Sequence, residues 1–168
     1  MKEIKLVLIL SDVRSCYNVG SIFRTADASG VSEVVCCGIT PYPRLANDRR
    51  PEKIIANNTK MIHKTALDAE NSVKYSHFDS VIDVINQYKK LDFEIIALEN
   101  KVPNTQNIFQ FKSIRKNIVL VLGSETSGLD NSILKLCSST VEIPMRGIKN
   151  SLNVSVATGI ALYALLDQ

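Results

Sequence analysis

Short runs of aliphatic residues recur along this chain. The first covers residues 4–10 and is almost continuous, and similar runs rich in Val and Ile cover residues 33–37, 94–98 and 117–122. A strand with one face in water alternates apolar and polar residues, whereas continuous apolar runs of this length are typical of strands buried on both faces of a parallel sheet. We therefore expect these four runs to be strands of such a sheet.

Segments with helical signals lie between the runs. Residues 21–29 are closed by Gly30, residues 80–90 begin with Ser80 and Asp83 at the spacing of a capping box, and residues 130–137 form a third segment. Strand and helix thus alternate along the chain, which predicts an α/β fold with a mostly parallel sheet flanked by helices. A length of 168 residues with 45% hydrophobic content favours one domain, residues 1–168.

The last segment, residues 151–166, is rich in Val, Ala, Ile and Leu and carries hardly a charge. A helix at the surface of a globular protein normally has one polar face. We therefore expect this helix to be buried, either against the sheet or against a second subunit.

A basic, proline-containing segment covers residues 40–58, and we interpret it as an extended loop with local positive charge. Such a loop could contact an RNA backbone, or it could be a solvated segment that keeps the protein in solution. The candidate RNA-binding residues are Arg44, Arg49, Arg50 and Lys53, with Lys60, Lys64 and Lys149 as further possibilities.

Composition narrows the class of protein only a little. A net charge of +3 and a pI near 8.7 do not separate a nucleic-acid binder from an ordinary enzyme. The four cysteines show no Cys-x-x-Cys pair and no neighbouring histidine, so we expect no metal and no disulfide framework. Neither a basic leader nor an apolar window of about 18 residues is present, and we expect a cytoplasmic protein without a membrane span.

The first of three polar blocks, residues 18–27, follows the first predicted strand. We expect a polar turn containing Gly20 that leads into a helix at the carboxyl end of the strand, where α/β proteins bind ligands. Arg24 would then lie in the first turn of the helix and could hold a phosphate or a developing alkoxide. Alternatively, Arg24 is a surface residue that pairs with Asp27.

The second block, residues 120–129, is a buried strand that runs into a loop of small residues around Glu125. Gly123 and Gly128 carry no Cβ, so a ligand could approach the backbone closely. The block lacks the Gly-x-Gly-x-x-Gly fingerprint of dinucleotide-binding proteins. The alternative is an ordinary turn before a helix capped by Asp130.

The third block, residues 143–157, takes the chain from a short strand through a basic turn into the apolar helix. Ser151, Asn153 and Ser155 place hydrogen-bonding groups around the first turns of that helix. Buried polar groups need partners, so these residues either cap the helix or hold a ligand, and capping accounts for only one or two of them.

Together and in this order, the three blocks resemble the SpoU/TrmH-type family of SPOUT methyltransferases, and Ser-Leu-Asn-Val-Ser-Val-Ala in the third block is the most specific match. The resemblance implies a parallel-sheet α/β domain with a deep trefoil knot, whose knot and cofactor-binding region covers about residues 118–168. It also implies a homodimer, with the apolar C-terminal helix at the interface and an active site drawn from both protomers.

The resemblance further implies transfer of a methyl group from S-adenosylmethionine to a ribose 2′-hydroxyl of transfer or ribosomal RNA. The cofactor would bind at Leu122, Gly123, Ser124, Ile143, Met145, Ser151 and Leu152, and the matching catalytic positions are Arg24, Asn18, Glu125, Ser151 and Asn153. Because a guanidinium is hardly ever neutral near neutral pH, we expect Arg24 to stabilise the developing alkoxide and to grip the adjacent phosphate.

Two alternatives remain open. A base-methylating enzyme of the same superfamily would need different groups to handle the base, and the block from Asn18 to Arg24 favours ribose. A non-catalytic RNA-binding protein on the same fold would need neither Arg24 nor Asn153. Many relatives carry Asn-Glu-Gly where this chain has Ser124-Glu125-Thr126, which affects the choice of nucleotide more than the class of reaction.

Overall fold

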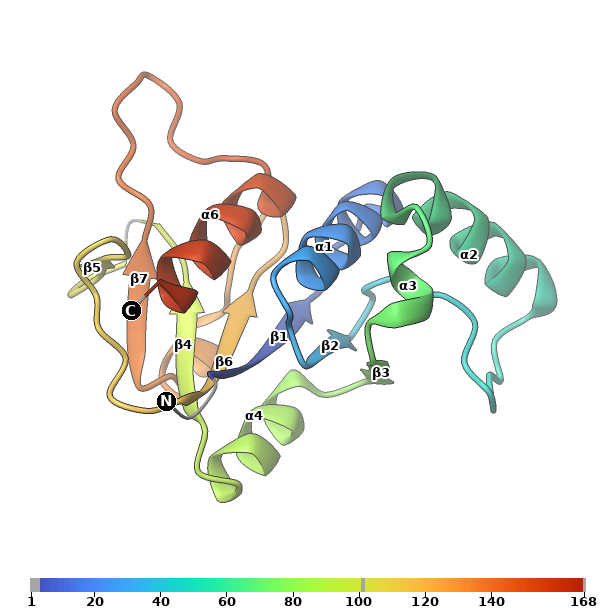
Figure 1. Ribbon diagram of the computed structural model, residues 1–168, viewed down its shortest axis with the longest axis horizontal. Coiled ribbons are helices and arrows are strands. Elements are labelled where there is room, and N and C mark those ends of the chain that lie inside the picture. Colours follow the sequence, from blue (N-terminus) through green and yellow to red (C-terminus); the bar gives the residue numbers. More distant parts are fainter. Residues whose placement is uncertain (1–3, 101, 168) are drawn as a thin grey trace.

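The computed structural model of the protein describes residues 4–100 and 102–167 and shows a central sheet with helices on both faces (Figure 1). Seven strands lie in the order β3-β2-β1-β6-β4-β7-β5, and every strand pairing among the described residues is parallel. The expected α/β fold with a parallel sheet is therefore confirmed. The strands are β1 Lys5–Ser11, β2 Glu33–Cys37, β3 Tyr75–Phe78, β4 Glu94–Leu98, β5 Gln106–Asn107, β6 Asn117–Leu122 and β7 Ser139–Glu142.

Two hydrophobic clusters, one on each face of the sheet, hold the helices in place. α1, α2, α3 and α6 contribute to the larger cluster, whereas α4 and α5 pack on the other face. The helices are α1 Cys16–Ala28, α2 Glu52–Ala66, α3 Ala69–Ser72, α4 Val81–Lys90, α5 Asn131–Leu134 and α6 Val154–Leu166. Figure 1 shows α1 and α6 side by side over the same face of the sheet.

The continuous aliphatic runs have a direct explanation in these two clusters. In β1, Leu6, Leu8 and Leu10 belong to the larger cluster, and Val7 and Ile9 belong to the other. Because successive side chains of a strand point to opposite faces, a strand covered on both faces needs an apolar residue at every position.

The direction in which strands are added to the sheet changes at β1. From β1 the chain proceeds to β2 and β3 on one side, whereas β6 and β4 lie on the other side of β1. Open parallel sheets bind ligands where the direction of strand addition changes, at the carboxyl ends of the strands. All three polar blocks begin at this edge of the sheet.

The start of α1 corrects one prediction. The helix begins at Cys16 and not at residue 21, because Ser15 caps it by accepting a hydrogen bond from the backbone N–H of Asn18 at 3.3 Å. Gly20 lies inside the helix and not in a turn. A Cβ at Gly20 would lie 2.2 Å from both Ile62 O and Thr65 Oγ1, so glycine allows α1 to pack closely against α2.

The basic segment is also only partly a loop. α2 begins at Glu52, directly after Pro51, so the second half of the predicted loop at residues 40–58 is helical. Ile55, Ile62 and Ala66 form the buried side of this helix. Proline is common just before or within the first turn of a helix, and the prediction treated Pro51 as a sign of irregular backbone.

Three smaller differences concern the ends and edges of elements. α6 begins at Val154, three residues later than predicted, and α5 is confined to Asn131–Leu134. α3, β3 and β5 were not predicted; β3 and β5 are the two edge strands of the sheet. Over the residues that the structure describes, no helix is long and apolar enough to cross a membrane.

Candidate active site

A cleft of about 530 Å³ opens at the carboxyl edge of the sheet. Three segments form its walls: the end of β4 at residues 98–100, the loop after β6 at residues 122–128, and the segment from the end of β7 to the first turns of α6. All seven residues predicted to bind a cofactor line this one cleft, although they come from segments about twenty residues apart. These residues are Leu122, Gly123, Ser124, Ile143, Met145, Ser151 and Leu152.

The loop after β6 is a tight, self-bonded turn. Gly128 donates its backbone N–H to Ser124 O at 3.1 Å, and Ser127 donates its backbone N–H to Ser124 Oγ at 3.1 Å. A Cβ at Gly123 would lie 2.4 Å from the backbone carbon of Gly128, so Gly123 is needed to bring the two ends of the loop together. Gly128 has φ of +66°, a left-handed conformation that favours glycine.

A chain of hydrogen bonds links the three polar blocks. Glu125 Oε1 accepts a hydrogen bond from Asn18 Nδ2 at 2.8 Å, and Asn18 Oδ1 accepts one from Asn153 Nδ2 at 3.0 Å. Asn18 is more than 100 residues from each of these partners in sequence. The structure thus brings together three of the five predicted catalytic residues, and a fourth, Ser151, lines the adjoining cleft.

The carboxylate of Glu125 also holds the chain in front of α1. Its Oε2 accepts the backbone N–H of Arg14 at 3.0 Å, and its Oε1 lies 3.4 Å from the backbone nitrogen of Ser15. Partial burial by itself would raise the pKa of Glu125, but the hydrogen bonds from Arg14, Asn18 and Ser15 lower it below its ordinary value. Glu125 is therefore an ionised hydrogen-bond acceptor at neutral pH and a poor proton donor.

Asn153 caps α6, as one interpretation of the third block predicts, and it also donates a hydrogen bond to the first block. As the N-cap of α6 it accepts hydrogen bonds at Oδ1 from the backbone N–H of Ser155 at 2.8 Å and from its hydroxyl at 2.6 Å. Its amide nitrogen remains free to donate to Asn18. Because Oδ1 is held by the cap, Nδ2 is the side-chain atom of Asn153 that is directed toward Asn18.

Arg24 lies away from this hydrogen-bonded chain, contrary to its expected place in the first turn of the helix. It is more than two turns beyond Cys16, where α1 begins, and its side chain is exposed on the face opposite the buried residues of that helix. The alternative pairing with Asp27 does not form, and Asp27 Oδ1 instead accepts a hydrogen bond from Ser72 Oγ at 2.5 Å. The side chain of Arg24 makes no hydrogen bond or ion pair within residues 4–100 and 102–167.

Glu99 and Asn100 line the cleft and were not predicted. Glu99 Oε2 accepts the backbone N–H of Leu129 at 2.8 Å, and Asn100 Nδ2 donates to Asn150 O at 3.1 Å. These contacts tie the end of β4 to both other walls. The sequence does contain a signal for these two residues: they are polar and directly follow a buried strand, and ligand sites lie at the carboxyl ends of parallel strands.

The four predicted RNA-binding residues differ in how free their side chains are. Arg49 and Lys53 are exposed, and Arg44 is exposed but forms an ion pair with Glu52. Arg50 is held inside the loop: it pairs with Asp48 at 2.6 Å, and its guanidinium lies 3.4 Å from the centre of the Tyr42 ring. Arg50 therefore has little surface left for a phosphate.

Comparisons with known proteins match the whole of this architecture. The sequence profile of the SpoU rRNA Methylase family matches residues 5–163. The 23S rRNA (guanosine-2′-O-)-methyltransferase RlmB of Nitrosomonas europaea is 27% identical over 168 residues, which are 100% of this chain and 58% of that protein. The chain spans about 60% of the length of the curated relatives that it matches.

Solved structures are similar in the same way. The SpoU methyltransferase AviRb from Streptomyces viridochromogenes, in complex with the cofactor AdoMet, has a TM-score of 0.78 and 25% identity, covering 100% of this chain and 59% of that one. The TrmH/SpoU tRNA modifying enzyme of A. aeolicus has a TM-score of 0.73 and 26% identity, covering 99% of this chain and 76% of that one.

Proposed function

The chain belongs to the SpoU rRNA Methylase family, and from this membership we propose that it transfers the methyl group of S-adenosylmethionine to a ribose 2′-hydroxyl of transfer or ribosomal RNA. One observation carries the proposal: the cleft that contains all seven expected cofactor residues adjoins the hydrogen-bonded chain of Asn18, Glu125 and Asn153. Relatives named for 2′-O-methylation and a similar structure with bound AdoMet support it.

The cleft suits S-adenosylmethionine in size and chemistry. A volume of about 530 Å³ lies within the range of small-molecule pockets, roughly 300–1,000 Å³. Its lining combines apolar side chains, suited to an adenine ring, with backbone groups and the polar side chains of Glu99, Asn100 and Ser124, suited to ribose and amino-acid groups. When bound, the cofactor supplies a methyl group activated by a sulfonium.

The protein's own residues would then align the acceptor ribose. Asn153 is fixed by capping α6 and Asn18 is fixed by Glu125, so their amide groups are preorganised hydrogen-bonding partners beside the cleft. Glu125 orients Asn18 through an ionised carboxylate, and Ser151 lines the cleft next to them. Arg24 would stabilise the developing alkoxide and contact the neighbouring phosphate.

This role of Arg24 requires a second copy of the chain, because within one chain Arg24 points away from the sheet. α1 and α6 lie side by side, with Thr25 Cγ2 3.5 Å from the Cβ position of Gly159. On α6 the outward residues Val156 and Tyr163 are 51% and 56% exposed. We propose that a homodimer covers the exposed side of α6 that carries Val156 and Tyr163, and that it brings Arg24 of one protomer to the cleft of its partner.

A complementation experiment tests the shared site. Arg24→Ala and Asn153→Ala homodimers are each expected to lose methyl transfer by at least about 10²-fold, the usual effect of removing one electrostatic stabiliser. A heterodimer of the two variants contains one cleft with both residues intact, so it is expected to regain up to about half the activity of the unaltered dimer. If Arg24→Ala transfers methyl groups at the native rate, or if mixing restores nothing, the shared-site proposal is wrong.

We further propose that residues 1–168 form one domain, in which residues 118–168 make the trefoil knot and the cofactor site, and that the protein works in the cytoplasm. RNA would be held by the exposed cations Arg44, Arg49 and Lys53 around the start of α2, while Arg50 shapes the loop through Asp48 and Tyr42.

The reaction is tested with unmodified transfer and ribosomal RNA transcripts and S-adenosylmethionine, followed by digestion to nucleosides and mass spectrometry. A 2′-O-methyl nucleoside is the expected product and would also identify the base that carries the ribose. A base-methylated nucleoside would instead support a base-methylating enzyme on this fold. Absence of any methylated product with the whole RNA pool would favour a non-catalytic RNA-binding protein.

A further inference from the structure

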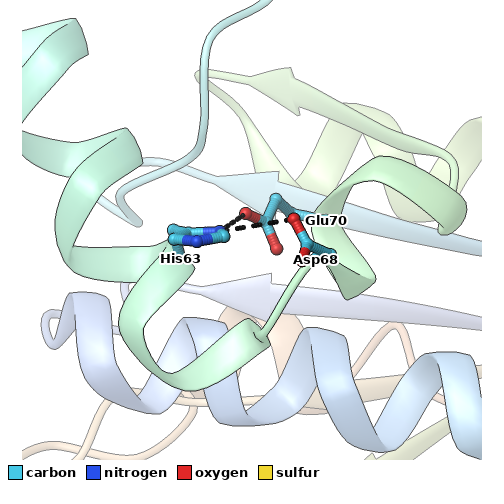
Figure 2. Close-up of side chains that lie close together, drawn as sticks. All are labelled: His63, Asp68 and Glu70. Carbon is cyan, nitrogen blue, oxygen red and sulfur yellow. Dashed lines mark hydrogen bonds and ion pairs between the residues drawn. The ribbon is translucent and has the colours of Figure 1, made fainter.

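A second cavity, of about 430 Å³, lies where α2 meets α3, and it shares no lining residue with the candidate active site. Its walls include three side chains with metal-ligating atoms, His63, Asp68 and Glu70, which Figure 2 shows pointing toward one another. The cysteine pattern predicts no metal, and none of the four cysteines belongs to this group.

The local backbone brings these residues together. His63 is in the last turn of α2, and the next two residues after that helix, Leu67 and Asp68, have positive φ values of 50° and 73°. This reversal directs α3 back along the end of α2 and places the Glu70 carboxylate at the Nδ1 edge of the His63 ring. Asp68 occupies the N-cap position of α3, but its carboxylate makes no capping hydrogen bond and is directed toward His63.

The distances between the possible ligand atoms are close to those of a metal site, and small side-chain movements would complete the geometry. His63 Nδ1 lies 2.6 Å from Glu70 Oε1 and 3.8 Å from Asp68 Oδ1, and one ligand atom from each residue lies within 4.8 Å of the others. Ligand atoms bonded to one tetrahedral zinc ion at about 2.0–2.2 Å are roughly 3.3–3.6 Å apart. Shifts of about 1 Å in the exposed His63 and Asp68 side chains would therefore produce this geometry.

Glu70 is the independent sign that a ligand belongs here. Its side chain is only 6% exposed, and its Oε2 has no hydrogen-bond partner among the residues that the structure describes. A buried carboxylate oxygen without a partner is costly and unusual in a folded protein. The other oxygen, Oε1, lies 2.6 Å from His63 Nδ1. A cation bound in the cavity would compensate the charge that Glu70 brings into the protein.

We propose that His63, Asp68 and Glu70 bind one divalent ion of the zinc class, through His63 Nδ1 and one oxygen of each carboxylate, with water in the fourth position. A mixed nitrogen and oxygen ligand set suits Zn²⁺ better than Mg²⁺ or Ca²⁺, which prefer oxygen alone.

The surroundings permit a cation to enter. The side chains of His63 and Asp68 are 51% and 77% exposed, which leaves a route from solvent. Arg44 and Lys60 also line the cavity, but Arg44 forms an ion pair with Glu52 and Lys60 is exposed to screening water. The ion would fasten the end of α2 to α3 and would have no part in methyl transfer.

The test uses chelator-treated, full-length protein in which the partly accessible thiols are removed by Cys16→Ser and Cys137→Ser. Zn²⁺ is titrated in competition with a chromophoric chelator. We expect one site per chain and a rise in Tm of about 5–10 °C when free Zn²⁺ is a hundred times Kd. His63→Gln and Asp68→Asn are expected to weaken binding at least tenfold, whereas His77→Gln, at the other histidine, is the control and should bind normally.

A second measurement separates a built site from loose association at the surface. Calorimetric titration with Zn²⁺ should show a saturable phase of one ion per chain, and this phase should weaken in His63→Gln. Asp68 is exposed, so Asp68→Asn remains informative even if Glu70→Gln does not fold. Absence of Zn²⁺ binding, or equal affinity in the His63 and Asp68 variants, would overturn the proposal, and neither outcome bears on binding of S-adenosylmethionine.

Discussion

Replacing Gly123 by alanine should weaken binding of S-adenosylmethionine without unfolding the protein. The added Cβ would lie 2.4 Å from the backbone carbon of Gly128, 2.6 Å from its oxygen and 2.7 Å from the nitrogen of Leu129. Ordinary contacts between carbon atoms are about 3.5–4.0 Å, so the loop must open by about 1 Å, and because all three atoms belong to the backbone no side chain can turn aside. The cleft wall at residues 122–128 would therefore move.

The expected magnitude follows from the usual cost of overpacking, about 1–3 kcal/mol. If this cost falls on the form of the loop that binds the cofactor, Kd rises roughly 5- to 150-fold. The measurement is calorimetric titration with S-adenosylmethionine, accompanied by thermal unfolding. Gly147→Ala is the matched control, because nothing lies within 4 Å of a Cβ at Gly147 in the segment that forms the opposite wall. A Gly123→Ala protein that binds within twofold of the native Kd would refute the reasoning.

Three further predictions address the fold, the charge of the site and the RNA surface. Gly20→Ala places a Cβ 2.2 Å from Ile62 O and should lower Tm by about 2–10 °C, as measured by calorimetry; an unchanged Tm would contradict the close packing of α1 on α2. Because the pKa of Glu125 is lowered in the folded state, its stabilising contribution is present above its ordinary pKa of about 4.3 and is lost as pH falls through the lower folded value. The Tm difference between the native protein and Glu125→Gln should therefore shrink as pH falls below the ordinary pKa of about 4.3, and a difference independent of pH would count against the ionised role. Neutralising Arg49 and Lys53 together should reduce the slope of log K for RNA against log salt concentration by about 2, whereas Lys135→Gln on the far face of the sheet should leave the slope unchanged; equal slopes in all three proteins would remove the basic loop from the RNA surface.

The central strands could be predicted because their burial on both faces requires continuous apolar runs in the sequence. β1, β2, β4 and β6 are covered on both faces, so almost every position is apolar. β3 and β5 lack such an apolar run, because they are short edge strands that contain polar residues. A strand of this kind is defined by its neighbour and not by its own residues.

The helix boundaries that were missed depend on contacts between distant segments. Asn18 and Gly20 have the local preferences of a turn, but α1 includes both because Gly20 fits against α2 and Asn18 is held by Glu125. α2 contains Asn57, Asn58 and Thr59, which are weak helix formers, and its packing on α1 outweighs them. Local propensity is easily overridden where a tertiary contact is this close.

The residues of the candidate site also include some that could be predicted from the sequence and some that could not. The seven cofactor residues were predicted from the resemblance of the three polar blocks to the SpoU/TrmH-type family, and the structure places all seven along one cleft. The direction of the Arg24 side chain depends on where α1 begins and on which side of α6 is exposed beside it. The sequence around Arg24 indicates neither of these. Glu99 could have been found from its position directly after β4, at the edge where the cleft lies.

Resistance of the RNA product to alkali shows whether the methyl group is on a ribose oxygen. RNA methylated with labelled S-adenosylmethionine is hydrolysed in alkali, which cleaves through the free 2′-hydroxyl. A methyl group on that oxygen blocks cleavage, so we expect the label in alkali-resistant dinucleotides and its loss in Asn153→Ala. Label recovered in single nucleotides would place the methyl group on a base and would rule out ribose methylation.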